Sequence, residues 1–346
     1  MPRNLALRSS DRRAARQRGR REAPALSVIS AVALLLLAAC AATPESVDDA
    51  AVAAEPVFVE GEAADTAHPL NGVIWDVAAG VEIDARTLAL RLGAAEFVML
   101  GEVHDNAVHH RRQAQLIRAL QPGGVAFEMV PEASERGVAA FRAQGGALGE
   151  IGPAIGWARL GWPDWSIYRP VFEAVGDATI TGGGVSRADL NAAIRGGASA
   201  PFGAGAGAAG LDEALDPETQ AALEAEMIAA HCDALPAAMA PGMVEAQRLR
   251  DARFATAVLR AIDARRPPTV LVTGNGHARS DRGVPFYLAR LAPERRVLSL
   301  GQIEVRLGEE LIFDYLDADG GAPFDYLWFS GGVPDRGDPC AVFRKG

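Results

Sequence analysis

The segment VMLGEVHDNAVHH, residues 98–110, places a carboxylate and three histidines, Glu102, His104, His109 and His110, close together after an apolar run. The whole chain has only six histidines. Imidazole and carboxylate side chains are the groups that proteins use to bind divalent metals, to contact haem and to transfer protons. The segment alone is compatible with each of these uses and with simple helix capping.

Five short apolar runs punctuated by glycine recur along the chain, and helical patterns separate most of them. Continuous apolar runs of this length are typical of strands that are buried on both faces. Strands that alternate with helices predict an α/β fold, with a mostly parallel sheet and helices on both of its faces. The predicted strands are residues 96–102, 124–129, 178–183, 269–276 and 296–301, and the clearest helices are residues 106–121, 133–144 and 244–265.

Polar side chains follow four of these predicted strands. In a parallel sheet the carboxyl ends of the strands meet at one edge, where ligand sites gather. We therefore expect one site formed by Glu102 and His104 after the first strand, Glu128 at the end of the second, Ser186 and Arg187 after the third, and Asn275 and His277 after the fourth. The alternative is that each is an ordinary cap or turn residue, as we expect Asp105 and Asn106 to be for the next helix.

The helix predicted after the first strand adds two side chains to the same edge. His109, Gln113, Leu116 and Leu120 fall on a single helical face. We expect the two leucines to pack on the sheet, which leaves His109 and Gln113 nearest to the site. His110 is rotated by about 100° from His109 and is expected at the surface or at the rim of the site.

Two insertions depart from the regular alternation. The segment IGWARLGWPDWSIYRP, residues 155–170, holds three of the five tryptophans and Tyr168. Aromatic side chains at this density suit a flat ligand, or else form a plug beneath a helical lid. The second insertion begins with the Gly/Ala-rich loop 196–210 and predicts a helical hairpin with Pro236 and Pro241 in its turn.

The N-terminus has the pattern of a lipoprotein leader. Eight arginines precede the apolar run ALSVISAVALLLLAAC, which is too short for a convincing membrane span. The run ends in Leu-Ala-Ala-Cys, which resembles the bacterial lipobox and makes Cys40 the expected site of lipidation. The alternative is a signal peptide that happens to contain a cysteine.

These patterns divide the chain into a lipoprotein signal peptide (1–39), a lipid-anchored tether (40–67) and one α/β domain (68–346). The tether is rich in Ala, Pro and acidic residues without a sustained period, which predicts flexibility. Ala41 and Ala42 lack the acidic residue that retains many lipoproteins at the inner membrane. We therefore expect a lipid-anchored protein of the cell envelope, on the outer membrane and facing the periplasm.

The charge of the processed chain restricts its partners. Removal of the leader would leave 26 basic and 42 acidic residues, a net charge of −16. This balance argues against nucleic acid as a partner. The membrane is expected as a partner through the N-terminal lipid.

Export also affects how the cysteines are interpreted. With Cys40 lipidated, Cys232 and Cys340 are the two remaining thiols. An oxidising compartment favours a disulfide between them, and the alternative is two independent buried thiols.

Several motifs together resemble the ChaN-like haem-binding uptake lipoproteins, a branch of the Tiki and erythromycin-esterase-like superfamily. HPLNGVIWD is similar to the opening strand of that family, and VMLGEVHDNAVHHRRQ to its Gly-Glu-x-His turn. GVAFEM resembles its second strand, while HCDALP, MVEAQRLRDARFA and VLVTGNGHARSDRGVP match later blocks. The Gly-Glu-x-His and Gly-Asn-Gly-His pairs together are fairly specific, and the resemblance spans nearly the whole predicted domain.

The resemblance implies haem as the cofactor, a homodimer around the haem and a haem or iron uptake receptor as partner. In that family a tyrosinate ligates the iron and histidine assists. Tyr168 is our candidate iron ligand because it lies in the aromatic insertion, whereas the other tyrosines of the predicted domain follow the last motif. The further residues expected to contact haem are His104, His109, His277, Glu102, Gln113 and Asn275.

Two other functions stay open beside haem binding. Glu102, His104 and His277 could hold a divalent metal and activate water, as proposed for related Tiki-type proteases. They could instead act as a general base and an orienting acid without metal, as in the related esterases. A closed structural zinc site is not expected, because Cys232 lacks Cys-x-x-Cys spacing. We expect a binding protein rather than an enzyme, and a hydrolase if it is an enzyme.

Lipid attachment gives a direct prediction. Because the thiol of Cys40 is the expected acceptor of the lipid, Cys40→Ser should abolish incorporation of labelled fatty acid and release the protein from the membrane fraction. The measurement is metabolic labelling followed by membrane fractionation. Unchanged labelling in the variant would show that Cys40 is not the anchor.

Overall fold

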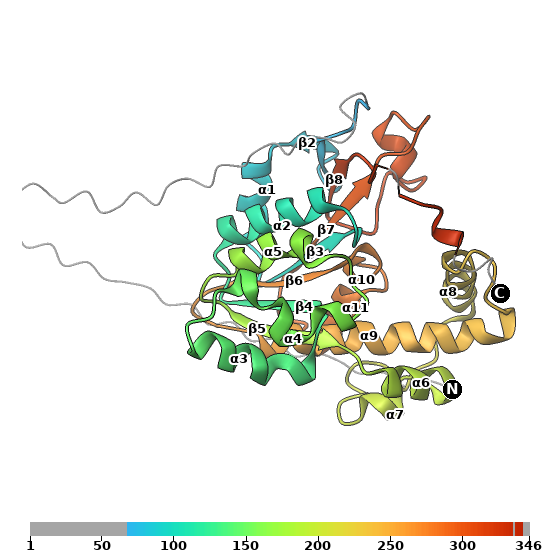
Figure 1. Ribbon diagram of the computed structural model, residues 1–346. Coiled ribbons are helices and arrows are strands. Elements are labelled where there is room, and N and C mark those ends of the chain that lie inside the picture. The colour runs from blue at the N-terminus through green and yellow to red at the C-terminus, as the bar shows by residue number, and fades with distance from the viewer. Residues whose placement is uncertain (1–67, 335, 342–346) are drawn as a thin grey trace, which may run out of the picture. The chain divides into compact units, whose positions relative to one another are not determined.

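The computed structural model describes residues 68–334 and 336–341 (Figure 1). The expected leader, Cys40 and the tether lie outside the described residues, so the three-part division of the chain stays a prediction. Within the described part of the chain, none of the helices combines the length and the apolarity that crossing a membrane would need.

One eight-stranded sheet organises the described residues, with the strand order β2-β1-β8-β7-β3-β6-β4-β5. Strands β8 to β5 in this order pair in parallel, whereas β1 and β2 add an antiparallel edge. The strands are β1 (Ile74–Asp76), β2 (Val81–Ile83), β3 (Phe97–Glu102), β4 (Gly124–Pro131), β5 (Thr179–Gly184), β6 (Thr269–Gly274), β7 (Val297–Glu304) and β8 (Tyr326–Ser330). All five strands expected from apolar runs are present, and β2 and β8 are additional.

The middle strands are apolar throughout because helices cover both of their faces. Every residue of β3 and of β6 is buried. Successive side chains of a strand point to opposite faces, so Val98 and Leu100 pack in one hydrophobic core while Phe97 and Met99 pack in the other. This arrangement confirms the expected α/β class, with a mostly parallel sheet between two helical layers.

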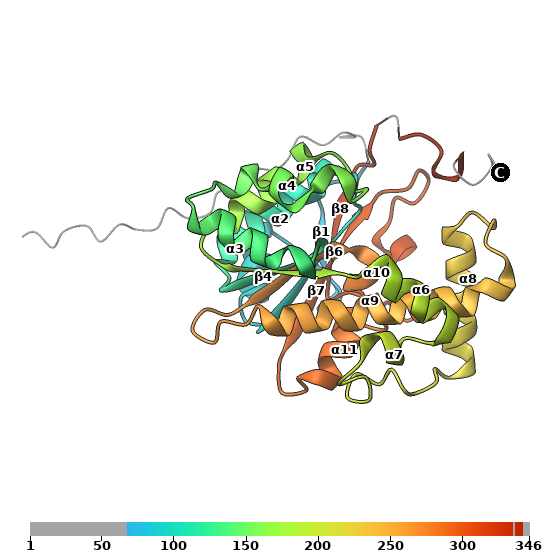
Figure 2. The same cartoon turned by 60° about the horizontal axis from the view of Figure 1, so that its bottom comes forward.

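Figures 1 and 2 show the two helical layers on either side of the sheet. The first layer contains α1 (Ala85–Leu92), α2 (Ala107–Leu120), α3 (Glu135–Ala143), α4 (Gly152–Ile155) and α5 (Trp165–Ala174). The second contains α6 (Arg187–Gly196), α7 (Ser199–Phe202), α9 (Ala240–Arg260), α10 (Asn275–Ala278) and α11 (Val284–Leu291). Helix α5 packs on α2 as well as on the sheet, where Phe172 stacks on Phe127 with 4.3 Å between ring centroids.

The expected helical hairpin is formed by α8 (Pro217–Ala230) and α9. Asp216 caps α8, because its side chain accepts hydrogen bonds from two backbone N–H groups of the first turn. Pro236 lies in the connection, but Pro241 lies in the first turn of α9 rather than in the loop. A proline is tolerated there because the first-turn N–H groups have no partner inside the helix.

Cys232 and Cys340 are joined by a disulfide with their Cα atoms 5.6 Å apart. The bond connects the segment after α8 to the C-terminal segment, which is otherwise tied down by Arg336. The guanidinium of Arg336 pairs with Asp105, before α2, and with Glu304, at the end of β7. The hairpin and the C-terminal segment are therefore linked covalently.

Thiol counting tests this bond. In a Cys40→Ser variant, denatured but unreduced protein should contain no free thiol. Because the bond closes a loop of 108 residues, its reduction should lower the free energy of unfolding by about 4 to 5 kcal/mol at most. Ellman titration and urea unfolding with and without reductant measure both quantities, and two reactive thiols before reduction would contradict the pairing.

Candidate functional site

Three neighbouring strands supply the polar side chains of the candidate site. Strand β6 pairs with β3 on one side and with β4 on the other, although it follows both far along the chain. Glu102, the last residue of β3, lies in register with Gly274, the last residue of β6. Helix α10 begins directly after Gly274 and carries His277, while Glu128 lies in β4. The strand order thus brings these side chains to one edge of the sheet.

Glu102 is the centre of an inner cluster that is closed to solvent. Its Oε1 accepts a hydrogen bond from the Tyr168 hydroxyl at 2.5 Å and lies 2.8 Å from His104 Nδ1. Its Oε2 lies 3.4 Å from Nε2 of His110, whose ring packs on Tyr168 with 4.0 Å between centroids. Since the side chain of Glu102 is 0% exposed, it makes no direct contact with solvent.

The protonation states of the inner cluster follow from competition between burial and charge. Burial alone would raise the pKa of Glu102, but His110 and His104 outweigh it and hold that pKa well below its usual range. Burial, together with the Glu102 carboxylate, raises the pKa of Tyr168. Burial lowers the pKa of His104, but the bond to Glu102 and the charge of Glu128 raise it to about 9. Near neutral pH, Glu102 is therefore ionised, Tyr168 is a neutral donor and His104 is an imidazolium.

Glu128 is the centre of an outer cluster and joins it to the inner one. Its Oε2 accepts hydrogen bonds from Thr273 Oγ1 at 2.7 Å and from the Gly274 N–H at 2.8 Å. Its Oε1 lies 3.5 Å from His277 Nε2 and 3.9 Å from His104 Nε2. Burial opposes ionisation of Glu128, but the two histidines and these hydrogen bonds lower its pKa. A single carboxylate thus faces both imidazoles.

Asp251 of α9 fixes the ring of His277. Its Oδ1 lies 2.6 Å from His277 Nδ1, so that Nε2 is left to face Glu128. Burial would lower the pKa of His277, but Glu128 and Asp251 outweigh it and raise the pKa. Burial raises the pKa of Asp251 to about 6. Two buried carboxylates therefore share one imidazole.

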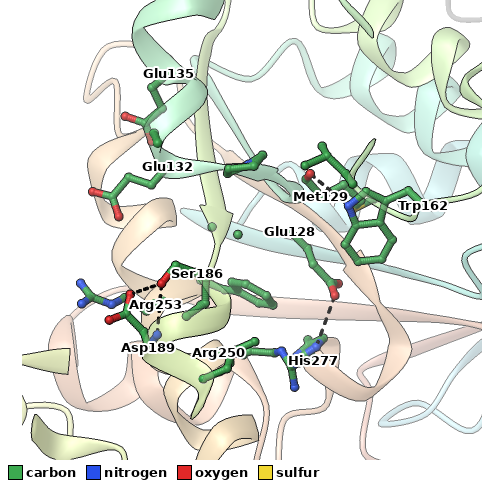
Figure 3. Close-up of a pocket in the computed structure, with 18 of the residues that line it drawn as sticks. Glu128, Met129, Glu132, Glu135, Trp162, Ser186, Asp189, Arg250, Arg253 and His277 are labelled. Atoms are coloured by element: carbon green, nitrogen blue, oxygen red, sulfur yellow. Dashed lines mark hydrogen bonds and ion pairs between the residues drawn. The ribbon is translucent and has the colours of Figure 1, made fainter. Parts of the chain in front are cut away.

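A pocket of about 890 Å³ opens beside the outer cluster, beyond the carboxyl ends of β4 and β5. Glu128 and His277 line it, and Figure 3 shows Trp162 on one side of Glu128 and Arg250 beside His277. Trp162 also packs on the ring of His104, with 4.9 Å between centroids. The lining combines apolar surface with three cations, Arg136, Arg250 and Arg253.

The aromatic insertion is mainly a packed plug. Trp157 packs on Trp165 and on Tyr168, with ring centroids 5.0 and 4.8 Å apart; Trp157 and Tyr168 belong to the buried core of the first helical layer, and Trp165 packs against it. Trp162 is the tryptophan of this segment that lines the pocket. Contact of this segment with a flat ligand stays a prediction.

Tyr168 lies inside this plug and does not line the pocket. It is 0% exposed, and its hydroxyl donates to Glu102 and lies 3.3 Å from His104 Nδ1. A tyrosinate ligand needs access to the iron and loss of the phenolic proton. Burial and the neighbouring carboxylate oppose both, so the geometry does not favour the expected role of Tyr168 as the iron ligand; its hydroxyl contacts Glu102 and His104 instead.

The positions expected of the adjacent histidines His109 and His110 are reversed, because His110 and not His109 lies against the inner cluster. His110 was expected at the surface or rim, and this is wrong: it is 0% exposed and lies against Glu102 and Tyr168. Helix α5 covers the outer face of α2, so that both faces of α2 are buried.

His109 points away from the clusters toward β8. Its Nδ1 accepts a hydrogen bond from the Val103 N–H at 2.9 Å, and its Nε2 lies 2.8 Å from Ser330 Oγ. Burial and the charge of Arg112 lower the pKa of His109 to about 3. His109 is a neutral residue that connects α2 to the sheet, and the geometry does not support its expected contact with haem.

Gln113 and Asn275 also have structural partners. Gln113 donates to the Leu100 carbonyl at 3.1 Å. Asn275, the first residue of α10, binds the backbone of β7: its Nδ2 donates to the Gln302 carbonyl at 2.6 Å and its Oδ1 accepts from the Gln302 N–H at 3.1 Å. Neither lines the pocket, so the geometry does not support the expected haem contacts of these two residues.

Capping accounts for two of the four remaining polar residues, Asn106 and Ser186. Asn106 caps α2 as expected, with its side chain accepting from the Val108 N–H, but Asp105 pairs with Arg336 instead. Ser186 caps α6, and its side chain also lines the pocket. Arg187 is an exposed residue of the first turn of α6.

The residues expected to hold a divalent metal are not arranged as one ligand set. Glu102 and His104 are in contact, but Glu128 lies between His104 and His277. Among the residues that the structure describes, no group of three or more His, Cys, Asp or Glu side chains is placed to hold a metal ion.

Asp251 and the pocket arginines were missed from the sequence. A signal for Asp251 exists, because it falls on the same helical stripe as Val244, Ala255 and Val258, all of which are buried. An acidic residue on an apolar stripe needs a buried partner. Nothing in the sequence pattern distinguishes Arg250 from its neighbours on α9.

His104 makes the stability of the protein depend on pH. Its pKa is raised from 6.5 to about 9, so its contribution is fully present below pH 6.5 and is lost as the pH rises through 9. His104→Gln should therefore destabilise the protein more at pH 6.5 than at pH 9.5, by about 1 kcal/mol once solvent screening of this partly exposed side chain is allowed for. Urea unfolding at both pH values measures this, with His231→Gln as a matched control. An equal destabilisation at the two pH values would contradict the assignment.

Comparison with known proteins places the chain in a family. A family model described as haem-binding uptake, Tiki superfamily, ChaN matches residues 88–288. A solved structure described as "Cofacial heme binding to ChaN of Campylobacter jejuni" is 18% identical with a TM-score of 0.59, over 75% of this chain and 97% of that chain, which shows similarity of fold.

A second solved structure, "The structure of the type III effector HopBA1", is 15% identical with a TM-score of 0.40, over 72% of this chain and 94% of that chain, and supports no argument. No curated protein matches the chain. The family model spans more than half of the sequence and confirms the resemblance seen in its motifs. The chain therefore belongs to the haem-binding uptake (ChaN) family of the Tiki superfamily.

Proposed function

We propose that this protein binds haem in the pocket beside Glu128 and His277 and serves haem or iron uptake at the cell envelope. The observation that carries the proposal is that a member of the haem-binding uptake family has a pocket in which an imidazole, aromatic surface and arginines meet. The volume of about 890 Å³ lies within the range of small-molecule and cofactor sites.

The side chains of the pocket fit the chemistry of haem. An axial donor to haem iron is commonly a histidine whose second ring nitrogen is hydrogen-bonded to a carboxylate or carbonyl. His277 meets this requirement, because Asp251 holds Nδ1. Trp162 and Phe254 offer apolar contact to a porphyrin, and the arginines offer partners to its carboxylates. Bound haem would supply an iron centre, and His277 would hold it through Nε2.

This geometry favours His277 over Tyr168 as the iron ligand. His277 lines the pocket, whereas the Tyr168 hydroxyl is enclosed by Glu102, His104 and the aromatic plug. To hold iron, His277 would release the Nε2 proton that faces Glu128. Tyr168 then supports the site indirectly, by orienting Glu102 against His104.

The proposal extends to the location and partners of the protein. Lipidation at Cys40 would hold it on the outer membrane facing the periplasm, where haem or iron enters the cell envelope. A homodimer around the haem and an uptake receptor complete the proposal. These parts rest on the leader pattern and on the family to which the chain belongs.

Haemin titration tests the proposal. Wild-type protein should give a saturable Soret shift. His277→Ala should remove or displace that band because the axial nitrogen is lost, and Asp251→Asn should weaken binding by about 10- to 100-fold because the ring of His277 is no longer held. Tyr168→Phe should keep the spectrum, with His231→Ala as a control distant from the pocket. Absence of a saturable shift in the wild type would reject haem binding, and a shift lost only in Tyr168→Phe would return the ligand role to Tyr168.

Hydrolysis by acid–base chemistry is the second candidate function. The observation that favours it is the continuous chain of groups, all buried except the partly exposed His104, from Tyr168 through Glu102, His104, Glu128 and His277 to Asp251. Haem binding does not require such a chain. Coupled carboxylates and imidazoles with shifted pKa values are typical of general acid–base sites.

In this second candidate function, the two glutamates would have different roles. Glu128 lines the pocket and is ionised, so it is the carboxylate able to act as a base. Glu102 is closed to solvent and acts by holding His104 protonated. Hydrolysis of a panel of esters and peptides that disappears in both Glu128→Gln and Glu102→Gln would support this function, and hydrolysis that survives Glu128→Gln would reject it.

A further inference from the structure

Helix α9 carries four arginines, and three of them have hydrogen-bond or ion-pair partners among the described residues. Arg248 pairs with Glu245, Arg260 pairs with Glu135, and Arg253 donates to the Pro201 carbonyl at 2.9 Å. Arg250 makes no hydrogen bond or ion pair with any residue that the structure describes. It is nevertheless half-buried, between Leu249 and Asp251, both of which are fully enclosed.

Arg250 faces the pocket. It is one of the lining residues, and Figure 3 shows it next to His277 on the side of the pocket away from Trp162. Its positive charge opposes the rise in the pKa of His277, which Glu128 and Asp251 cause, and the rise in the pKa of Asp251, which burial causes. The guanidinium therefore lies at the wall where the proposed iron donor also lies.

The carboxylates that line the pocket are engaged elsewhere. Glu128 accepts from Thr273 and Gly274 and faces His277. The others are Glu135, which pairs with Arg260 and accepts from the Gly182 N–H; Glu132, which lies 3.9 Å from Arg260; and Asp189, which accepts from Ser186. The pocket thus contains a cation for which the described residues supply no counter-ion.

A half-buried guanidinium without an acceptor is unfavourable, since five N–H donors are only partly hydrated. A carboxylate is the group that complements it, because the planar fork of arginine binds both carboxylate oxygens. Uncharged apolar ligands would fill the pocket without satisfying these donors.

We propose that Arg250 binds a carboxylate of the ligand that occupies this pocket, which, on the proposed function, is a propionate of haem. Arg250 is then a specificity-determining residue: it selects porphyrins that carry free carboxylates over their neutral esters. Selection by this residue does not depend on iron, because Arg250 would contact a carboxylate of the ligand whereas His277 would hold the iron.

The experiment compares three probes: haemin, its dimethyl ester, and iron-free protoporphyrin IX. Wild-type protein should bind the ester about tenfold or more weakly than haemin, because charge-assisted hydrogen bonds are lost. Arg250→Gln should weaken binding of haemin and of protoporphyrin IX by a similar factor. Arg250→Gln should leave binding of the ester unchanged, because esterifying the carboxylates and replacing Arg250 remove the same interaction.

Two further variants complete the design. Arg118→Gln, an exposed arginine on α2 outside this pocket, is the matched control and should bind all three probes as the wild type does. Arg250→Lys keeps the charge without the planar fork and should bind haemin with intermediate affinity. The ester comparison uses wild-type protein alone and decides the question even if Arg250→Gln does not fold.

The outcomes separate this inference from the proposed function. If wild-type protein binds haemin and its ester equally, or if Arg250→Gln weakens both to the same extent, the carboxylate contact is overturned while haem binding stands. If the wild type shows no saturable binding of haemin, the proposed function and this inference both fail.

Discussion

The arrangement of the site depends on the contacts that the buried carboxylate of Glu128 makes. It accepts two hydrogen bonds from the end of β6 and faces one imidazole from the β3 side and one from α10. His104 and Glu128 can both lie against the end of β6 because Gly274 has no side chain. A Cβ at Gly274 would lie 2.9 Å from His104 Nε2 and 3.7 Å from Glu128 Oε2. Glu128 thereby holds the ends of three strands and the start of α10 in one geometry.

Burial of so many charges is tolerated because they alternate in sign. Glu102, Glu128 and Asp251 are each in contact with at least one histidine, so each carboxylate has a partner that offsets the loss of hydration. Removing one member of such a set leaves an uncompensated charge, which typically costs about 3 to 5 kcal/mol. The cluster is therefore a structural unit as well as a chemical one.

The aromatic insertion separates the inner cluster from the pocket. Trp157 and Trp165 bury Tyr168 and, through α5, the outer face of α2, so that Glu102 and His110 are enclosed. Trp162 instead turns toward the pocket and packs on His104, the one histidine of the inner cluster with a partly exposed side chain. A ligand in the pocket would meet Glu128, His277 and Arg250 directly, while His104, which is not part of the pocket lining, connects Glu128 to Glu102 and Tyr168. This arrangement is compatible with both of the proposed functions.

The sequence by itself determined the class of the fold and the strand ends that carry the site. Apolar runs and glycines report which segments are buried, so the central strands, Glu102, His104 and His277 could be recognised locally. Strand order is not encoded in periodicity, and only the tertiary structure decided that β6 lies between β3 and β4 and that Glu128 separates His104 from His277.

The tertiary structure also decided which of the two adjacent histidines joins the cluster. One helical face predicts a single buried side, but α5 covers the other side of α2, so His110 is buried against Tyr168 while His109 bonds to β8. Arg250 and Asp251 lie within the motif MVEAQRLRDARFA and Tyr168 lies in the aromatic insertion, and all three reach the site from segments far along the chain from Glu102. The roles of Asp251 and Tyr168 depend on the partners that the fold brings within hydrogen-bond distance, and the role of Arg250 depends on its having no such partner among the described residues. Local sequence patterns do not specify these long-range contacts.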